Sequence, residues 1–271
     1  MLLRNTVESP MCNKVHFEEG IIPMKTIIRF LKTTFSVSLL IVASSAHANI
    51  NGAPVQAVRA VSDGNVEYVL ANLFGQSLYT FAPDPIDGTP VCNDTCAEVW
   101  PPFLISDEEA LNLLAPFSTV TRANGKKQLA REGKALYTYF LDRKAGDILG
   151  DGINDAWFDI HLDIGSVGGC AINQFALNES RDVKISTAGM AYSPKCLQIK
   201  KGTKVTFPAS SVHPLSALKE VLNFKNPLIT PTPKTAPITL EFNSTGVFGY
   251  FCVNHGSANG SGMAGAIEVI E

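Results

Sequence analysis

The sequence predicts an all-β protein in two parts, a duplicated small β-repeat domain followed by a Greek-key β-sandwich. Short segments of alternating polar and apolar residues recur along the chain, and turn residues separate them. No long segment shows convincing helical periodicity. The chain of 271 residues is 45% apolar and 17% charged, which is typical of a folded globular protein.

The C-terminal region contains the clearest strand signals. Gly202 divides one alternating stretch into two strands, and turn residues bound the later segments. The expected strands are 182–186, 197–201, 203–207, 238–242, 247–252 and 264–270. Repeated short strands of this kind indicate a β-sandwich of about 100 residues.

An internal repeat lies upstream of this region. The segment 75–84 aligns with 133–142, so that Tyr79 matches Tyr137 at an offset of 58 residues. Two copies of such a length, rich in short β segments and turns, predict a duplicated β unit. We expect the repeat aromatics to be core residues rather than binding-site residues. They are Tyr79, Tyr137, Trp100 and Trp157.

Residues 65–165 resemble a bacterial secreted repeat that is named for its Tyr-x-Phe-x-x-Asp motif and often occurs in lipoproteins. The first copy has the family's cysteine pair, Cys92 and Cys96, followed by Trp-Pro-Pro at 100–102. The second copy lacks the cysteines and has Asn-Asp-Ala-Trp at 154–157. The resemblance implies an architecture more than an activity.

The N-terminal 48 residues have the layout of a secretory signal peptide. A basic start at Met24 precedes an apolar stretch at 35–43 and the small-residue sequence Ala46-His47-Ala48, which predicts cleavage after Ala48 and a true start at Met24. The apolar stretch is much shorter than the ~20 residues of a membrane-spanning helix. No cysteine follows the cleavage site to carry a lipid. We therefore expect a periplasmic or secreted protein with no stable membrane insertion.

The predicted domains are the N-terminal extension with its signal peptide at 1–48, the tandem repeat domain at 49–165, and the sandwich at 166–271. The formal net charge is −3, and no run of Lys and Arg outside the N-terminal segment could follow a phosphate backbone. Nucleic acid is therefore a poor candidate partner. No general acid–base constellation is visible, so we do not expect an enzyme. We also expect the protein to be a monomer.

The cysteines of the predicted mature chain are odd in number, so they cannot all pair within one chain. Cys92 and Cys96 are close enough to form a disulfide across a turn. Cys170 and Cys196 could close a longer loop. Cys252 is then left unpaired, and a free thiol in an oxidising compartment needs a reason such as metal binding.

Four residues have the chemistry and spacing of a copper site. Cys252 and His255 are three residues apart at the end of an expected strand, Met263 follows a Gly- and Ser-rich loop, and His213 lies upstream after another strand. Two imidazoles and a thiolate in a plane, with a weak axial thioether, are the ligands of a blue-copper centre. The thioether makes this set a poor one for zinc.

The same region resembles the cupredoxins, the superfamily of plastocyanin and azurin, over about residues 182–271. The matching segments are 192–202, 212–215, 249–256 and 262–269. The resemblance implies one type 1 copper ion that carries single electrons to and from redox proteins such as a cytochrome or an oxidoreductase. The sequence departs from many plastocyanins in its longer and flexible loop between His255 and Met263.

The resemblance also implies that His255 lies near the surface, within a docking patch of small or apolar residues. The expected patch residues are Pro214, Leu215, Ala258 and Ala264. Three alternatives remain open from the sequence. The site could buffer or deliver copper, the repeats could form an envelope interaction module beside a metal-free sandwich, and Cys92 with Cys96 could be a second metal or redox site.

Overall fold

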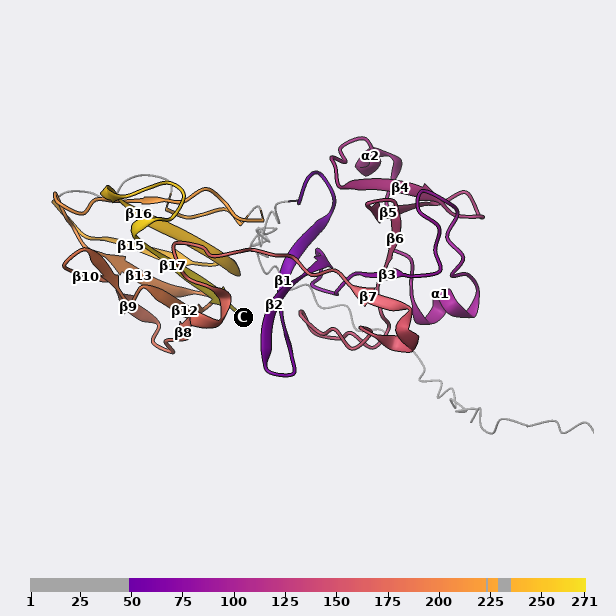
Figure 1. Ribbon diagram of the computed structural model, residues 1–271, viewed down its shortest axis with the longest axis horizontal. Coiled ribbons are helices and arrows are strands. Elements are labelled where there is room, and N and C mark those ends of the chain that lie inside the picture. Colours follow the sequence, from indigo (N-terminus) through magenta and orange to yellow (C-terminus); the bar gives the residue numbers. More distant parts are fainter. Residues whose placement is uncertain (1–48, 223, 229–234) are drawn as a thin grey trace, which may run out of the picture. The chain divides into compact units, whose positions relative to one another are not determined.

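The computed structural model describes residues 49–222, 224–228 and 235–271 (Figure 1), which belong to one compact unit. The predicted signal peptide and the proposed start at Met24 lie outside the described residues. Within the described ranges, no helix is both long and apolar enough to cross a membrane. The fold is all-β, as predicted, with strands as its main elements.

The two repeat copies share one five-stranded sheet. Its strand order is β4-β5-β6-β3-β7, so β3 from the first copy lies between two strands of the second copy. Tyr79 of β3 is the register partner of Tyr137 of β6, which makes the two equivalent motif positions direct neighbours. The strands are β3 (Tyr79–Phe81), β4 (Phe117–Thr121), β5 (Lys127–Arg131), β6 (Lys134–Tyr137) and β7 (Trp157–Asp159).

Each motif tyrosine bonds to the aspartate of the other copy. The Tyr79 hydroxyl donates to Asp142 Oδ2 at 2.7 Å, and the Tyr137 hydroxyl donates to Asp84 Oδ2 at 2.7 Å. Both carboxylates are buried, and each also accepts one backbone N–H, from Leu149 and from Val91 respectively. A buried carboxylate needs such partners, so the motif fixes the pairing of the two copies.

The repeat core is a stack of aromatic rings drawn from both copies. Trp100 and Trp157 stack at a centroid distance of 3.8 Å, and Phe81 and Tyr139 extend the stack on its two sides. Trp100 and Trp157 are buried, as are both motif tyrosines, which confirms their prediction as core residues.

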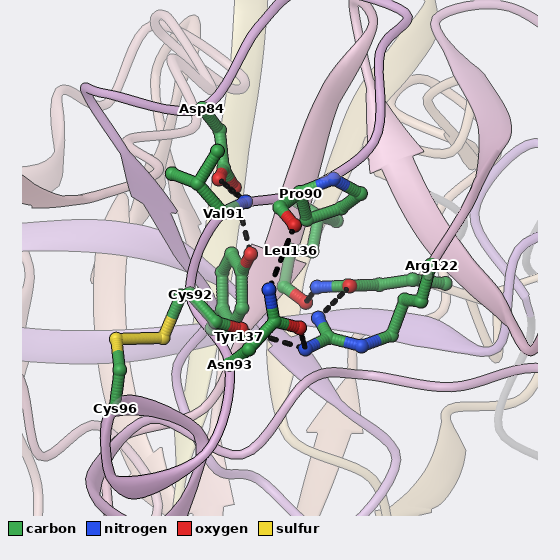
Figure 2. Close-up of a disulfide and its surroundings, with 10 residues drawn as sticks. Asp84, Pro90, Val91, Cys92, Asn93, Cys96, Arg122, Leu136 and Tyr137 are labelled. Atoms are coloured by element: carbon green, nitrogen blue, oxygen red, sulfur yellow. Dashed lines mark hydrogen bonds between the residues drawn. A yellow bond between two sulfur atoms is a disulfide. The ribbon is translucent and has the colours of Figure 1, made fainter. Parts of the chain in front are cut away.

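The Cys92–Cys96 disulfide joins the two ends of a short turn beside this core, as predicted. Figure 2 shows it with Arg122, whose guanidinium donates to the Cys92 carbonyl at 2.6 Å and to Asn93 Oδ1 at 2.7 Å. Gln128 accepts a further hydrogen bond from the same guanidinium at 2.7 Å. Arg122 is buried, so these acceptors satisfy a guanidinium that has little access to water. The short helices near this sheet are α1 (Thr95–Val99), α2 (Asp107–Ala110) and the 3₁₀ turn η1 (Ile153–Asp155).

A long hairpin precedes the repeat sheet, formed by β1 (Val55–Ser62) and β2 (Asn65–Asn72). Asp63 and Gly64 make its two-residue turn with φ of 49° and 81°, conformations that Asp tolerates and Gly adopts readily. After β7 the chain returns to β2, where the Leu70 N–H donates to the Ile160 carbonyl at 2.9 Å.

Two facing sheets form the C-terminal sandwich. The larger has the order β14-β16-β17-β12-β8, and the smaller has the order β15-β13-β9. Side chains from both sheets make one apolar core, which includes Ile199, Phe207, Phe242, Tyr250 and Ile267. The sandwich strands are β8 (Ala176–Leu177), β9 (Asp182–Lys184), β12 (Cys196–Lys200), β13 (Thr203–Phe207), β14 (Leu215–Ala217), β15 (Ile238–Phe242), β16 (Gly246–Gly256) and β17 (Gly262–Ile270). A separate hairpin of β10 (Ser186–Ala188) and β11 (Ala191–Ser193) and the 3₁₀ turn η2 (Ile172–Gln174) complete the described elements.

The six expected sandwich strands are all present with somewhat different ends, and β8 and β14 are additional strands that were not expected. Gly202 separates β12 from β13 with φ of 81°, as the sequence indicated. The strand expected at 247–252 continues to Gly256, and the strand expected at 264–270 begins at Gly262. The two strands lengthen because they pair with each other beyond the segments whose alternation is visible in the sequence.

One charged residue of the sandwich is fully buried. Glu268 of β17 accepts hydrogen bonds from Arg59 Nε at 3.2 Å, from the Tyr68 hydroxyl at 3.1 Å and from Gln198 Nε2 at 2.6 Å. Its relative exposure is 0%. Three donors satisfy the carboxylate, which would otherwise be costly to bury.

The crossed tyrosine–aspartate bonds give a first prediction. Tyr137→Phe removes the hydroxyl that donates to Asp84 and leaves a buried carboxylate with one partner fewer. We expect the free energy of unfolding, measured by urea denaturation, to fall by about 1–3 kcal/mol. Tyr139→Phe is the matched control, because the Tyr139 hydroxyl has no hydrogen-bond partner among the described residues. Equal losses in the two variants would show that the Asp84 bond contributes nothing specific.

Candidate metal centre

The β16–β17 hairpin carries three of the four predicted ligands. Phe251 pairs with Ala264, and the next register pair is Gly256 with Gly262. Four residues of β16, from Cys252 to His255, therefore bulge out opposite the single residue Met263 of β17. A bulge bends a strand and redirects its side chains. The register shift thus places Cys252 and His255 on one side of the hairpin and Met263 across from them.

The fourth predicted ligand arrives through β14. Leu215 of β14 pairs with Cys252, which brings His213, two residues earlier, beside the bulge. The Val253 N–H donates to the Pro214 carbonyl at 2.8 Å, and this bond continues the pairing to the ligand loop. No strand was expected at 215–217, because three residues are too few to show alternation.

Two polar side chains orient the loops around these ligands. Asn254 Nδ2 donates to the Val212 carbonyl at 2.8 Å and so connects the bulge to the loop that carries His213. Ser210 Oγ accepts the His213 backbone N–H at 2.7 Å. Sequence reasoning missed both residues, although Ser210 lies three residues before His213, the usual spacing for a side chain that accepts a local backbone N–H.

Three donor atoms lie close together in the resulting site. His213 Nδ1 and His255 Nδ1 are 3.1 Å apart, and Cys252 Sγ lies 3.8 Å and 3.4 Å from them respectively. Cys252 is buried and is the free cysteine among the described residues, whereas both histidines are half-buried. The three side chains thus form a cluster that is closed on the thiol side and accessible on the imidazole side.

The donor spacing fits a metal ion. Bonds of about 2.0–2.3 Å from a metal to imidazole nitrogen or thiolate sulfur put donors of one trigonal plane roughly 3–4 Å apart. The three measured separations fall in this range. Met263 is buried in the same apolar cluster as Cys252, which keeps its thioether inside the sandwich rather than in water.

Burial surrounds the thiol with low-dielectric material. The Tyr192 ring lies in the same core, and burial raises the pKa of its hydroxyl well above the ordinary value, with the Cys252 thiol adding to the effect. The sulfur of Cys252 therefore lies among apolar and aromatic side chains, with the two imidazoles as its nearest polar neighbours.

The long loop between His255 and Met263 is organised by its own hydrogen bonds, in contrast to the flexibility expected from its sequence. The Gly260 N–H donates to the Ser257 carbonyl at 2.9 Å, and the Ser257 N–H donates to the Ser261 carbonyl at 3.1 Å. At Gly256 a Cβ would lie 2.6 Å from the Met263 carbonyl oxygen, so glycine permits this close approach. The extra residues extend the hairpin and leave Met263 opposite the bulge.

The expected docking patch is partly wrong. Pro214, Leu215 and Ala264 are buried, because they belong to the paired strand edges, and only Ala258 of that set is exposed. The exposed apolar residues next to the ligands are instead Val212 and Val253, at 55% and 47%. Each is the sequence neighbour of a ligand.

The Cys170–Cys196 disulfide is present, as predicted. Cys196 begins β12, which pairs in parallel with β17, so the disulfide ties the segment before the sandwich to a strand beside the ligand hairpin. The two disulfides leave Cys252 without a cysteine partner among the described residues.

Comparison with known proteins gives two kinds of likeness. Residues 118–160 match a family model described as a secreted repeat of unknown function. Comparison with curated proteins finds no significant match. The family match covers most of the second repeat copy and says nothing about the ligand residues.

Among solved structures, the chain is similar to a pseudoazurin from Methylobacterium extorquens AM1, with 22% identity over 32% of this chain and 74% of the other and a TM-score of 0.28. A purple cupredoxin from Nitrosopumilus maritimus is 25% identical over 33% of this chain and 100% of the other, with a TM-score of 0.24. A copper-containing nitrite reductase from Thermus scotoductus SA-01 is 16% identical over 54% and 48%, with a TM-score of 0.28.

The disulfide pattern predicts the thiol content of the protein. The chain 49–271, produced by export, should show one thiol per molecule with Ellman's reagent in denaturant, and Cys252→Ala should show none. In the native, metal-free protein the reaction should be slow, because Cys252 is buried with a relative exposure of 0%. Three thiols per molecule in denaturant would contradict one of the two disulfides.

Proposed function

We propose that the C-terminal sandwich is a mononuclear copper protein of the blue-copper type that carries single electrons outside the cytoplasm. The observation that supports this most is the convergence of His213 Nδ1, Cys252 Sγ and His255 Nδ1 within 3.1–3.8 Å of one another. Met263 opposite the same bulge provides a candidate axial thioether. The resemblance of this segment to cupredoxins points to the same ligand set.

Bound copper would supply one-electron chemistry through its cuprous and cupric states. The residues of the chain provide a compromise between the preferences of these states, since thiolate and thioether suit the cuprous ion and imidazole suits both. Strand pairing, through Leu215 with Cys252 and Gly256 with Gly262, sets the ligand positions before any metal binds. Ligands held in this way move little when the charge changes, which favours fast electron exchange.

The half-buried imidazoles provide the side from which electrons enter and leave. Val212 and Val253 are exposed beside His213 and Cys252 and make an apolar rim that a partner surface can cover. Contact there would exclude water around the imidazoles and shorten the electron path. The proposed partners are redox proteins such as a cytochrome or an oxidoreductase, and the proposal requires no substrate pocket and no catalytic residue.

An extracytoplasmic location agrees with the described residues. Two disulfides are present, and disulfides persist mainly in oxidising compartments. The family model that matches residues 118–160 describes a secreted repeat. Both observations are consistent with the signal peptide that the sequence predicts.

The first test is the visible and EPR spectrum of the chain 49–271 after addition of one equivalent of Cu(II). We expect an intense visible band from thiolate-to-copper charge transfer and its loss in Cys252→Ala. Reversible bleaching by reductant without loss of copper would separate an electron carrier from a copper-delivery protein. A colourless wild type that takes up copper no better than Cys252→Ala would contradict the proposal.

The axial role of Met263 gives a separate prediction. Met263→Gln replaces a soft thioether with a harder amide oxygen, which stabilises the cupric state and should lower the reduction potential while the visible band persists. We expect a decrease of about 60 mV or more, which is tenfold in a one-electron equilibrium constant. Met190→Gln is the matched control because Met190 is exposed, with 59% of its surface accessible. An unchanged potential in Met263→Gln would exclude Met263 as the axial ligand.

A further inference from the structure

A second group of potential metal ligands lies away from Cys252, between the long hairpin and the repeat sheet strand β7. His161 Nδ1 lies 2.6 Å from Glu67 Oε2, and His161 Nε2 lies 2.9 Å from Asp159 Oδ1. One donor atom from each of the three residues can be chosen so that all lie within 4.8 Å of one another. The two carboxylates contact different nitrogens of the imidazole, yet the three side chains lie close enough together for one ion to bind a donor from each.

Backbone pairing fixes this convergence. Glu67 belongs to β2, Asp159 ends β7, and the segment after β7 pairs with β2 through the Val69–His161 bridge. The Leu162 N–H donates to the Tyr68 carbonyl at 2.7 Å, next to Glu67. The three side chains are thus delivered by paired strands rather than by a loop.

Asp159 is the unusual member of the group. Its side chain is 1% exposed, and neither carboxylate oxygen has a hydrogen-bond partner. The contact with His161 Nε2 is close, but its geometry is not that of a hydrogen bond. Buried polar atoms normally have hydrogen-bond partners, so a buried carboxylate whose close polar contact is one imidazole is a group that a cation could satisfy.

A further carboxylate lies close to the cluster. Asp151 Oδ1 accepts the Asp159 backbone N–H at 3.0 Å. A dication bound by Glu67, Asp159 and His161 would neutralise more of this negative charge than a single imidazolium can.

We propose that Glu67, Asp159 and His161 form a second metal site, which binds a divalent transition-metal ion such as Zn²⁺. One imidazole nitrogen and two carboxylates are a donor set that zinc accepts in a tetrahedral or slightly larger coordination shell, with water in the remaining positions. Magnesium and calcium prefer all-oxygen shells, so the imidazole selects against them. The His161 side chain is 61% exposed, which gives the ion a path from solvent.

Such an ion would tie the long hairpin to the repeat sheet. Glu67 and His161 are far apart in sequence but are joined at this point by β2 and the segment after β7. Binding should therefore raise the stability of the repeat domain, and the gain should grow with the logarithm of the free metal concentration once that exceeds the dissociation constant. The site is chemically distinct from the Cys252 cluster and needs no thiolate.

The test uses the chain 49–271 with Cys252→Ala and His213→Ala, because zinc could also occupy the thiolate cluster. In this background, isothermal titration with Zn²⁺ alone should show one ion per chain. Adding His161→Gln should abolish this binding, and His161 is exposed enough for that change to preserve the fold. Because the background lacks the thiolate and one imidazole of the candidate copper site, the result is independent of the proposed electron-transfer function.

Conservative variants of the acidic ligands sharpen the test. Glu67→Gln and Asp159→Asn keep the size of each side chain and should each weaken Zn²⁺ binding at least ~10-fold. Asp155→Asn is the matched control, because it removes the same charge as Asp159→Asn. Asp155 is exposed and lies only four residues from Asp159. The control should bind Zn²⁺ as tightly as its parent, and magnesium in millimolar excess should not compete.

Two outcomes would overturn the proposal. The first is equal weakening by Asp155→Asn, which would mean diffuse attraction to negative charge. The second is no uptake of Zn²⁺ by the Cys252→Ala, His213→Ala background. That result would assign the cluster as side-chain contacts of His161 with Glu67 and Asp159 alone.

Discussion

The register shift in the β16–β17 hairpin is the constraint on which the candidate copper site depends. Four residues, from Cys252 to His255, occupy the space opposite Met263. Normal pairing would alternate these side chains across the two faces of the sheet, and Cys252 and His255 would then point in opposite directions. The bulge removes this alternation locally, while the pairs on both sides keep the strands together. Pairing of β14 with β16 then adds His213 from the neighbouring strand.

The ligand types could be predicted from the sequence because they depend on chemistry and spacing. An unpaired cysteine, a histidine three residues later and a methionine after a Gly- and Ser-rich loop already indicate a copper site, and the structure brings His213, Cys252 and His255 together. The exposed surface could not be predicted in the same way. Pro214 and Leu215 are small or apolar and near a ligand, but pairing of Leu215 with Cys252 buries them. Burial of this kind depends on β14, a strand of three residues that leaves no alternation to detect.

In the repeat domain the motif can be read from a short stretch of sequence, but the hydrogen bonds that it makes join residues far apart in the chain. The first copy has the Tyr-x-Phe-x-x-Asp motif and the second has Tyr139 in place of the Phe, and within each copy the first tyrosine and the aspartate are only five residues apart. The structure instead bonds Tyr79 to Asp142 and Tyr137 to Asp84, across the two copies. A single copy would leave its buried aspartate without its tyrosine partner, which explains physically why the motif is duplicated. The crossing also accounts for the position of β3 between β6 and β7.

The free thiol of Cys252 is shielded by the same features that bring the candidate ligands together. Cys92 and Cys196 have partners close in space, and their disulfides leave Cys252 without a thiol to exchange with in the described residues. Its sulfur is buried, and attack on a disulfide requires an accessible thiolate. The half-buried imidazoles leave one accessible side through which a cation could reach the sulfur. The protein thus keeps Cys252 inert toward thiols and available to a metal by exposing the two neighbouring ligands and not the sulfur itself.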